Sequence, residues 1–320
     1  MNKNINKFLN KNIMCPNCNS VDLYSSTIQL ECSSCNAIFP IAPGERPVLI
    51  RDCNKIFPPS AYINQSQEQP SREKLFTKLI PSSSVNINRI KSLHIFAKSL
   101  ESFNPAYILV VGGGKQKEEL EKILTEYKNL CFIYTDIDTD ASVDVFCDAH
   151  EIPFRDQVFH GIVTTAVLEH VLYPEQVVHE IHRVLIEDGV IYSEIPFIQQ
   201  VHEGAYDFTR YTLSGHRRLL NQFAELDSGL VAGPATALVW SIERFALCFT
   251  LEKRSALIVK AGIRIFFFWI KYFDYLIQNN PHAMDGASCT YFLGKKIIGA
   301  KISDQAIIEG YTGAIKLRHN

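Results

Sequence analysis

The sequence contains no long run of lysine or arginine, and its basic residues are dispersed over all 320 positions. The formal net charge is -2 at pH 7. A protein that stays bound to nucleic acid gains most of its affinity from cations that neutralise phosphates. We therefore expect no stable nucleic-acid binding, although a transiently bound RNA substrate is compatible with this composition.

The sequence also lacks the apolar core of a signal peptide within residues 1–7. Its nine cysteines are an odd number, and five of them are scattered, several inside apolar stretches. This usage is typical of reduced thiols, so we predict a cytoplasmic protein. With 47% hydrophobic residues, the chain can bury a large core and is long enough for more than one domain.

The other four cysteines form two CxxC pairs, Cys15-Pro-Asn-Cys18 and Cys32-Ser-Ser-Cys35, with thirteen residues between them. Two such pairs offer four thiolates in a tetrahedron, which suits Zn²⁺. So short a segment cannot build its own core, so metal binding would supply its folding energy. A redox role is the alternative, but it needs only one pair. Because cysteines fill all four coordination positions, we predict a structural zinc ion.

The stretch that follows, Ile38-Phe-Pro-Ile-Ala-Pro-Gly44 with Pro47-Val-Leu-Ile50, resembles the small zinc-ribbon proteins that activate RNA and protein methyltransferases. Phe39 and Arg46 replace two residues that are usual in those proteins. Such a ribbon is often fused to a methyltransferase domain. The resemblance implies a zinc ribbon, and the residues after it are rich in proline, serine and glutamine, as in a linker. We predict a ribbon over 1–52 and a linker or strap over 53–84.

Apolar runs alternate with helical patterns through the rest of the chain, 85–320. This alternation predicts an α/β fold with a parallel sheet covered on both faces. A sixth strand and an antiparallel seventh strand would complete the sheet, with an apolar helical insertion at 233–285 between them. The predicted strands are 107–111, 131–135, 143–147, 159–164, 190–195, 225–232 and 289–294, and the predicted helices include 116–128, 174–185 and 213–223.

A glycine turn and two acids mark a nucleotide pocket at the ends of these strands. Ile108-Leu-Val-Val leads into Gly112-Gly-Gly114, Asp136 follows 24 residues after Gly112, and Asp148 follows 12 residues later. The glycines let the backbone approach a ligand, and a carboxylate at a strand end can accept hydrogen bonds from both ribose hydroxyls. An acid after the third strand suits an adenine amino group. The pattern predicts an adenosyl site.

With the continuation through Leu168-Glu-His170 and Ile181-His-Arg-Val-Leu185, residues 105–220 resemble the class I S-adenosylmethionine-dependent methyltransferases. The resemblance implies a Rossmann-like sheet of seven strands and S-adenosyl-L-methionine as cofactor. It also implies which residues bind that cofactor. Gly112 and Gly114 would hold its amino-acid part, Asp136 the ribose, and Asp148 with Ala149 the adenine, while Ile137 would flank the adenine and Thr165 would lie along the cofactor's edge.

The glycine loop departs from the family pattern at two positions. Val110 stands where an acid is usual, and Gln116 stands where a third glycine is usual. A catalytically degenerate scaffold or binding subunit with this fold is therefore an alternative. A nicotinamide-dependent oxidoreductase shares the glycine turn, but its fingerprint needs a glycine at the position of Lys117 and does not require Asp148.

Candidate residues for the methyl acceptor follow the fourth and fifth strands. The stretch from His202 through Asp207-Phe-Thr-Arg210-Tyr-Thr resembles a signature of methyltransferases that modify saccharides and lipids. His170 or His202 could take a proton from an acceptor hydroxyl, and Arg210 could hold an anionic or sugar substrate. The alternatives are a packing role for His170 and an ion pair between Asp207 and Arg210. We expect a small-molecule, saccharide or lipid-linked acceptor, with RNA as a further alternative.

The apolar insertion has too many charges for a simple membrane span. Lys260, Arg264, Lys271 and Asp274 would share a stripe about 80° wide on one helix, and the rest of 256–277 is mostly apolar or aromatic. One interpretation is a helix that lies on the inner face of a membrane. The other is a helical cap packed on the sheet or on a second subunit of a homo-oligomer.

Overall fold

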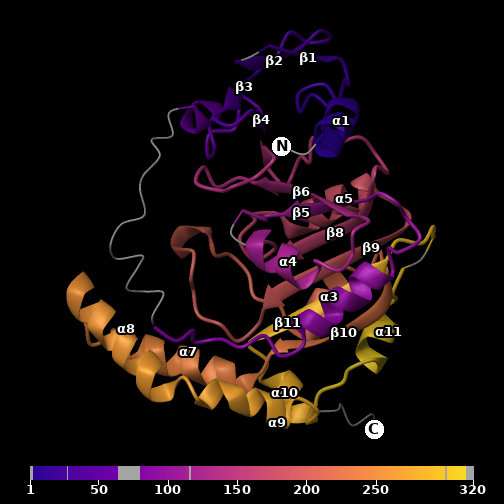
Figure 1. The fold of residues 1–320 in the computed structure, drawn as a ribbon. Coiled ribbons are helices and arrows are strands. Elements are labelled where there is room, and N and C mark those ends of the chain that lie inside the picture. The colour runs from indigo at the N-terminus through magenta and orange to yellow at the C-terminus, as the bar shows by residue number, and fades with distance from the viewer. Residues whose placement is uncertain (1–2, 27, 64–79, 115–116, 300, 315–320) are drawn as a thin grey trace.

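The computed structural model describes residues 3–26, 28–63, 80–114, 117–299 and 301–314 (Figure 1). Gln116 and part of the predicted strap, 64–79, lie outside them.

The molecule is built around a large twisted sheet. Seven strands form its main part in the order β7-β6-β5-β8-β9-β11-β10, and β11 runs antiparallel to both of its neighbours. The remaining pairs among these seven are parallel. This confirms the predicted seven-stranded α/β fold. The strands are β5 (Ala106–Val111), β6 (Leu130–Asp136), β7 (Val145–Cys147), β8 (Phe159–Thr165), β9 (Leu185–Pro196), β10 (Ala224–Ala232) and β11 (Cys289–Lys295).

Helices cover both faces of the sheet because the central strands are apolar on both sides. In β5, Leu109 belongs to one core cluster while Ile108 and Val110 belong to the other, as the alternation of side chains along a strand requires. The first face is covered by α1 (Lys3–Asn12), α5 (Pro174–Val184) and α6 (Leu213–Leu219), and the second by α3 (Arg89–Lys98) and α4 (Lys117–Ile123). A short helix, α11 (Asp304–Glu309), contacts α6.

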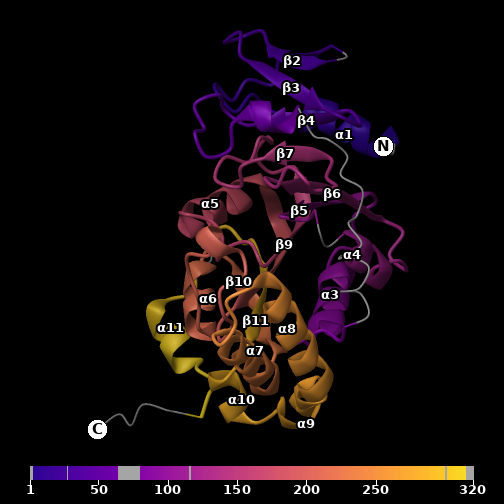
Figure 2. The same ribbon diagram turned by 90° about the vertical axis from the view of Figure 1, so that its left-hand side faces the viewer.

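The cysteine-rich segment extends the sheet at the β7 edge (Figure 2). Its last strand lies parallel to β7, with Val48 paired to Phe146 and Leu49 paired to Cys147. The preceding helix α1 adds Phe8, whose ring centroid lies 4.1 Å from that of Tyr107. The segment is therefore anchored by backbone pairing and by core packing. Its strands are β1 (Leu23–Ser25), β2 (Gln29–Cys32), β3 (Ile38–Ala42) and β4 (Arg46–Leu49).

The apolar insertion forms a helical layer beside β10 and β11, at the opposite end of the sheet from the ribbon (Figures 1 and 2). Residues 256–277 do not continue as one helix, because the chain tightens into a 3₁₀ turn after Phe268. The elements are α7 (Pro234–Leu247), α8 (Lys253–Phe267), η3 (Ile270–Phe273), α9 (Asp274–Ile277) and α10 (Pro281–Asp285). Within the described residues, none of the helices is long and apolar enough to cross a bilayer.

The start of α7 explains the path of this layer. Asp274 is fully buried, and its carboxylate accepts hydrogen bonds from the backbone nitrogens of Gly233, Ala235 and Thr236 and from the Thr236 hydroxyl. These are the donors that a helix leaves unsatisfied at its first turn, and a negative charge is favourable there. One carboxylate thus fastens α9 to the beginning of α7.

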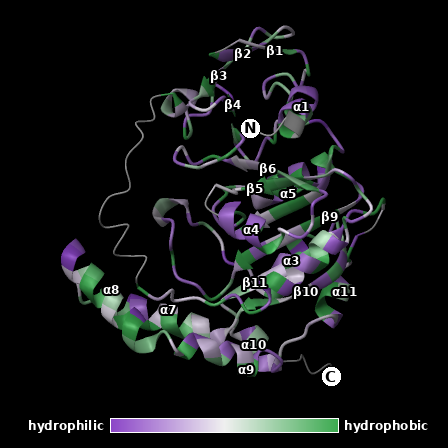
Figure 3. Cartoon of the chain, in the orientation of Figure 1, coloured by the Kyte–Doolittle hydropathy of each residue, from purple (hydrophilic) through white to green (hydrophobic). Residues whose placement is uncertain are grey.

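The polar stripe of the insertion points inward. Arg264 Nε lies 2.7 Å from the carboxylate of Glu243 in α7, which is fully buried, and Lys260 also contacts this acid. Lys271 is buried as well and donates to the carbonyl of Ser82. Most of the large apolar side chains of α8 and α9 are consequently exposed. Figure 3 shows many hydrophobic residues along these helices. The exposed ones on the layer are Leu238, Phe245, Phe249, Leu251, Leu257, Ile258, Ile265, Phe266, Trp269, Tyr272, Phe273, Tyr275 and Leu276.

Candidate functional site

A cavity of about 890 Å³ opens at the carboxyl ends of β5, β6, β7 and β8. In open parallel sheets this edge is where ligands bind. The cavity brings most of the sequence-predicted site residues together, from segments far apart in the chain. Those that line it are Gly112, Asp136, Ile137, Asp148, Ala149, His170 and His202.

The turn after β5 requires glycine for two reasons. Gly112 has a φ of +66°, and a Cβ placed on it would lie 2.3 Å from a methyl carbon of Val167. Gly114 has no room either, because a Cβ there would lie 2.3 Å from that of Ala141. The absence of side chains leaves the backbone at Gly112 as a wall of the cavity. Val110, the position where an acid was expected, is fully buried in the core.

Asp136 ends β6 and points its carboxylate at this turn. The backbone nitrogen of Gly114 donates to Oδ2 at 3.1 Å, and those of Ile137 and Asp138 donate to Oδ1 at 2.8 and 3.0 Å. Burial raises the pKa of Asp136, although these backbone donors oppose the rise. The carboxylate is therefore held in one orientation at the edge of the cavity, where a ligand with hydroxyl groups could reach it.

Asp148 lies across the same cavity. Its Oδ1 accepts from the backbone nitrogen of His150 at 2.9 Å and lies 2.6 Å from the Nδ1 of that ring, and its Oδ2 accepts from Asn54 at 3.1 Å. Burial alone would raise the pKa of this carboxyl, but the hydrogen bonds outweigh burial and the pKa is lowered. Asp148 is thus an ionised acceptor at neutral pH.

The segment after the ribbon forms a wall of the cavity that the sequence did not reveal. Phe57 and Tyr62 of this segment line the cavity, and the Tyr62 hydroxyl donates to the carbonyl of Ile137 at 2.6 Å. Tyr62 belongs to a short 3₁₀ helix, η1 (Pro59–Tyr62). Asn54 joins the same wall through its bond to Asp148. The composition of this stretch had indicated only a linker, so no local signal marked these contacts.

Two facing histidines line another side of the cavity. His170 Nδ1 lies 2.8 Å from the carbonyl of Tyr206, in η2 (Gly204–Tyr206), and its Nε2 lies 3.0 Å from His202 Nε2. Burial lowers the pKa of His170, so its ring is neutral at pH 7. Glu169, next in the chain, is fully buried, and burial raises its pKa to about 8. The sequence had placed both histidines beside the acceptor but had not predicted that they touch.

Arg210 and Thr165 lie outside the lining of this cavity. The guanidinium of Arg210 pairs with both carboxylate oxygens of Asp207 and donates to the carbonyl of Gln199. Burial opposes ionisation of Asp207, yet the hydrogen bonds from Arg210 lower its pKa to about 2. This ion pair braces the loop that carries His202. Thr165 is buried at the end of β8.

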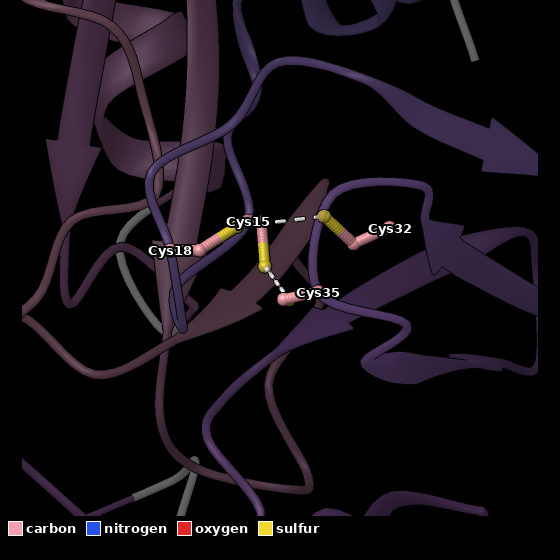
Figure 4. A group of neighbouring side chains, drawn as sticks. All are labelled: Cys15, Cys18, Cys32 and Cys35. Carbon is pink, nitrogen blue, oxygen red and sulfur yellow. Dashed lines mark hydrogen bonds between the residues drawn. The ribbon is translucent and has the colours of Figure 1, made fainter.

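The four clustered cysteines lie close together on two segments of the ribbon, one before β1 and one at the end of β2 (Figure 4). Cys15 and Cys35 place their sulfurs 3.6 Å apart, as do Cys18 and Cys32. Four thiolates about 2.3 Å from one zinc ion would be separated by about 3.8 Å, so the arrangement is compatible with zinc. Each CxxC pair is followed by an asparagine in the left-handed region, with φ of 60° at Asn19 and 58° at Asn36. The two loops therefore turn in the same way around the sulfurs.

A comparison with known proteins indicates what kind of domain contains this cavity. Residues 113–193 match a family model described as a methyltransferase domain. No match was found among curated protein sequences. The chain therefore carries a methyltransferase domain, as the strand-end residues predicted.

Three similar solved structures are distant. A protein described as a sarcosine dimethylglycine methyltransferase from Galdieria sulphuraria is 14% identical, with 66% of this chain and 86% of that chain covered and a TM-score of 0.43. Phosphoethanolamine N-methyltransferase 2 from Haemonchus contortus, solved with S-adenosyl-L-methionine, is 14% identical. The match covers 67% of this chain and 54% of that chain, with a TM-score of 0.43. A chain from a complex between the Haloferax volcanii Trm112 methyltransferase activator and a methyltransferase is 15% identical. The match covers 66% of this chain and 93% of that chain, with a TM-score of 0.38. Such distant similarity indicates no substrate or partner.

Proposed function

We propose that this chain, whose central domain is a class I methyltransferase domain, transfers methyl groups from S-adenosylmethionine to a saccharide or lipid-linked small-molecule acceptor. The observation that carries the proposal is the single cavity lined by Gly112, Asp136 and Asp148 on one side and by His170 and His202 on the other. The adenosyl half of the cofactor would lie between the two carboxylates. The methyl group would then point towards the histidines.

The cofactor supplies a reactive methyl group, and the residues of this chain align the acceptor and exclude water. Gly112 permits close approach of the amino-acid part of the cofactor. The ribose hydroxyls would donate to Asp136, and the adenine amino group would donate to Asp148, displacing Asn54 or sharing the carboxylate with it. His170 or His202 would take the proton of an acceptor hydroxyl.

Calorimetry with S-adenosylhomocysteine tests the proposal. We expect saturable binding in the micromolar to millimolar range that is usual for substrates of enzymes. A folded protein that gives no heat at high ligand concentration would instead indicate a degenerate scaffold, which the apolar Val110 favours. A melting shift with NADH but not with S-adenosylhomocysteine would indicate an oxidoreductase. Incubation with S-adenosylmethionine that carries a labelled methyl group, together with cell extract or separately with total RNA, would identify the acceptor by the molecules that become labelled.

We further propose that the outer face of α7, α8 and α9 docks on a bilayer surface. The two cations at the beginning of α8, Lys253 and Arg254, are exposed. Trp269, Tyr272 and Tyr275 are exposed on the following turns, and such aromatic residues are enriched where protein meets the membrane interface. Exposed apolar rings beside cations fit an anionic lipid surface. They fit a second molecule of this protein less well, because its identical face would carry the same positive charge.

The same layer borders the acceptor side of the domain. A hollow of about 750 Å³ lies between α7 and the loop that carries His202, with Arg210, Arg244 and Leu247 in its lining. Arg244 donates to the carbonyl of Val201, and the ring of Trp240 lies 6.5 Å from that of His202. An acceptor attached to a lipid would therefore enter beside α7. This arrangement supports a lipid-linked acceptor over a freely diffusing one.

Sedimentation with vesicles provides the test. We expect the protein to bind phosphatidylcholine vesicles that contain phosphatidylglycerol, and the double change Phe266→Ser and Trp269→Ser to weaken binding at least about tenfold, since each large apolar side chain contributes roughly 1.5–3 kcal/mol when buried. A matched control changes Ile28 and Ile38 of the ribbon to serine, since Ile28 is 72% exposed and Phe266 is 73% exposed. Binding to no vesicle, with dimers in light scattering, would assign the face to a second copy.

A further inference from the structure

The buried carboxylate of Glu169 is the starting point of a second inference. The side chain is fully buried at the end of the β8 loop, and neither of its oxygens has a hydrogen-bond partner among the residues that the structure describes. A buried carboxyl group without hydrogen bonds is costly whether it is protonated or ionised, and in native structures such groups are hydrogen-bonded, paired with a cation or bound to a metal ion. The ring of His170 lies beside it, with Nε2 3.6 Å from Oε1.

The two histidines point their Nε2 atoms at the same place. His170 and His202 have their Nε2 atoms 3.0 Å apart, and one ligand atom from each of these residues and from Glu169 lies within 4.8 Å of the other two. Two neutral imidazoles can face each other in this way only if one donates a proton to the other or if a cation lies between them.

The far side of each ring indicates which nitrogen carries the proton. His170 Nδ1 faces the carbonyl of Tyr206 at 2.8 Å. His202 Nδ1 faces the carboxylate of Asp207 at 3.5 Å and the carbonyl of Gln200 at 3.4 Å. All three partners only accept hydrogen bonds, so both rings favour the proton on Nδ1 and a lone pair on Nε2. Metal-binding histidines are held in this way by an outer carboxylate or carbonyl.

We propose that Glu169, His170 and His202 bind a divalent transition-metal ion, with zinc as the best match. A carboxylate with two imidazoles is a ligand set of catalytic zinc sites, in which a further coordination position stays open. The Nε2 atoms would need to separate slightly, to the roughly 3.3 Å expected around tetrahedral zinc. Both histidines line the cavity, so the open position would face the acceptor. An oxygen or nitrogen of the substrate could bind there.

The metal site itself does not depend on the proposed function. Only the identity of the substrate that would bind the metal ion rests on that proposal. A metal ion would occupy both Nε2 atoms, so the two histidines could not then serve as bases. The loop that brings His202 to His170 is braced by Asp207, whose carboxylate also accepts from the His202 backbone nitrogen at 3.0 Å. The buried carboxylate of Asp207 thus holds His202 in place.

Zinc content measured on the full chain tests the site. After incubation with excess zinc and desalting, we expect about two zinc ions per chain, one in the cysteine cluster and one in the new site. His202→Asn and Glu169→Gln should each reduce the content by about one. The matched control, His179→Asn, changes an exposed histidine of α5 and should keep both ions. Cobalt adds a second readout, because thiolate ligands give intense charge-transfer bands that a nitrogen and oxygen site lacks.

One zinc ion per chain in the wild-type protein would overturn the proposal, as would a second ion that persists in both variants. The first outcome would indicate a shared proton between the two histidines. His202 lies on a loop, so His202→Asn provides a folded variant if Glu169→Gln does not fold, and circular dichroism checks each variant. Calorimetry with S-adenosylhomocysteine on the same samples tests the methyltransferase proposal separately from the metal site. If the protein does not bind the cofactor, its zinc content should still be about two ions per chain.

Discussion

Replacing Asp136 with alanine is expected to weaken S-adenosylhomocysteine binding by about 100-fold. A carboxylate that accepts from both ribose hydroxyls contributes two charge-assisted hydrogen bonds, each worth roughly 1.5–3 kcal/mol. The melting temperature should change little, because the backbone nitrogens that lose their acceptor lie beside the cavity and can be hydrated. Calorimetry measures the affinity, and a thermal melt measures the stability.

Asp140→Ala is the matched control for this change. Asp140 lies four residues further along the same loop, but it is exposed and is not part of the cavity lining. Its replacement should leave the affinity unchanged. If Asp136→Ala binds as tightly as the wild-type protein, the ribose does not lie at the end of β6, and the assignment of the cavity to an adenosyl group is wrong.

Removal of zinc is expected to unfold the ribbon and to lower cofactor affinity as well. We infer that the four-cysteine cluster holds a structural zinc ion, and in small zinc-binding domains the metal contributes roughly 10–16 kcal/mol at pH 7. Loss of β4 would expose the edge of β7, and the segment that follows β4 would lose the contacts of Asn54 and Tyr62 with the cavity. Most of the helical signal should survive, since α3 to α10 belong to the larger domain.

A chelator titration followed by circular dichroism, limited proteolysis and calorimetry checks this expectation. Cys32→Ser should reproduce the effect of the chelator, whereas Cys248→Ser, at an exposed cysteine at the end of α7, should not. Complete collapse of the helical signal would show that the larger domain cannot fold without the ribbon. Unchanged cofactor affinity in the zinc-free protein would show that Asn54 and Tyr62 are dispensable for the pocket.

The central fold could be predicted because its signals are local. Buried strands such as β8 and β11 are short apolar runs with clear ends, and Asp136 and Asp148 follow strands directly. The wall formed by Asn54 and Tyr62 could not be predicted in this way. Their partners lie 94 and 75 residues away in the chain, and the polar composition around them is the same as that of a solvated linker.

The orientation of the apolar insertion could not be predicted from the local sequence pattern either. The spacing of Lys260 and Arg264 placed them on one side of α8, where both contact Glu243, but periodicity does not say which side of a helix faces the core. That choice depends on Glu243 and on the beginning of α7, which offer buried partners for the charges. Apolar side chains usually face the core, and here the buried ion pairs reverse the rule.

The backbone pairing of β4 with β7 has a consequence for assembly. When a ribbon and a catalytic domain are separate proteins, their complex dissociates on dilution and its amount depends on how much of each is synthesised. In this molecule both belong to one covalent chain, so the tether sets a high effective concentration at the joint that does not fall with protein abundance. Every copy is made with its own ribbon in fixed stoichiometry.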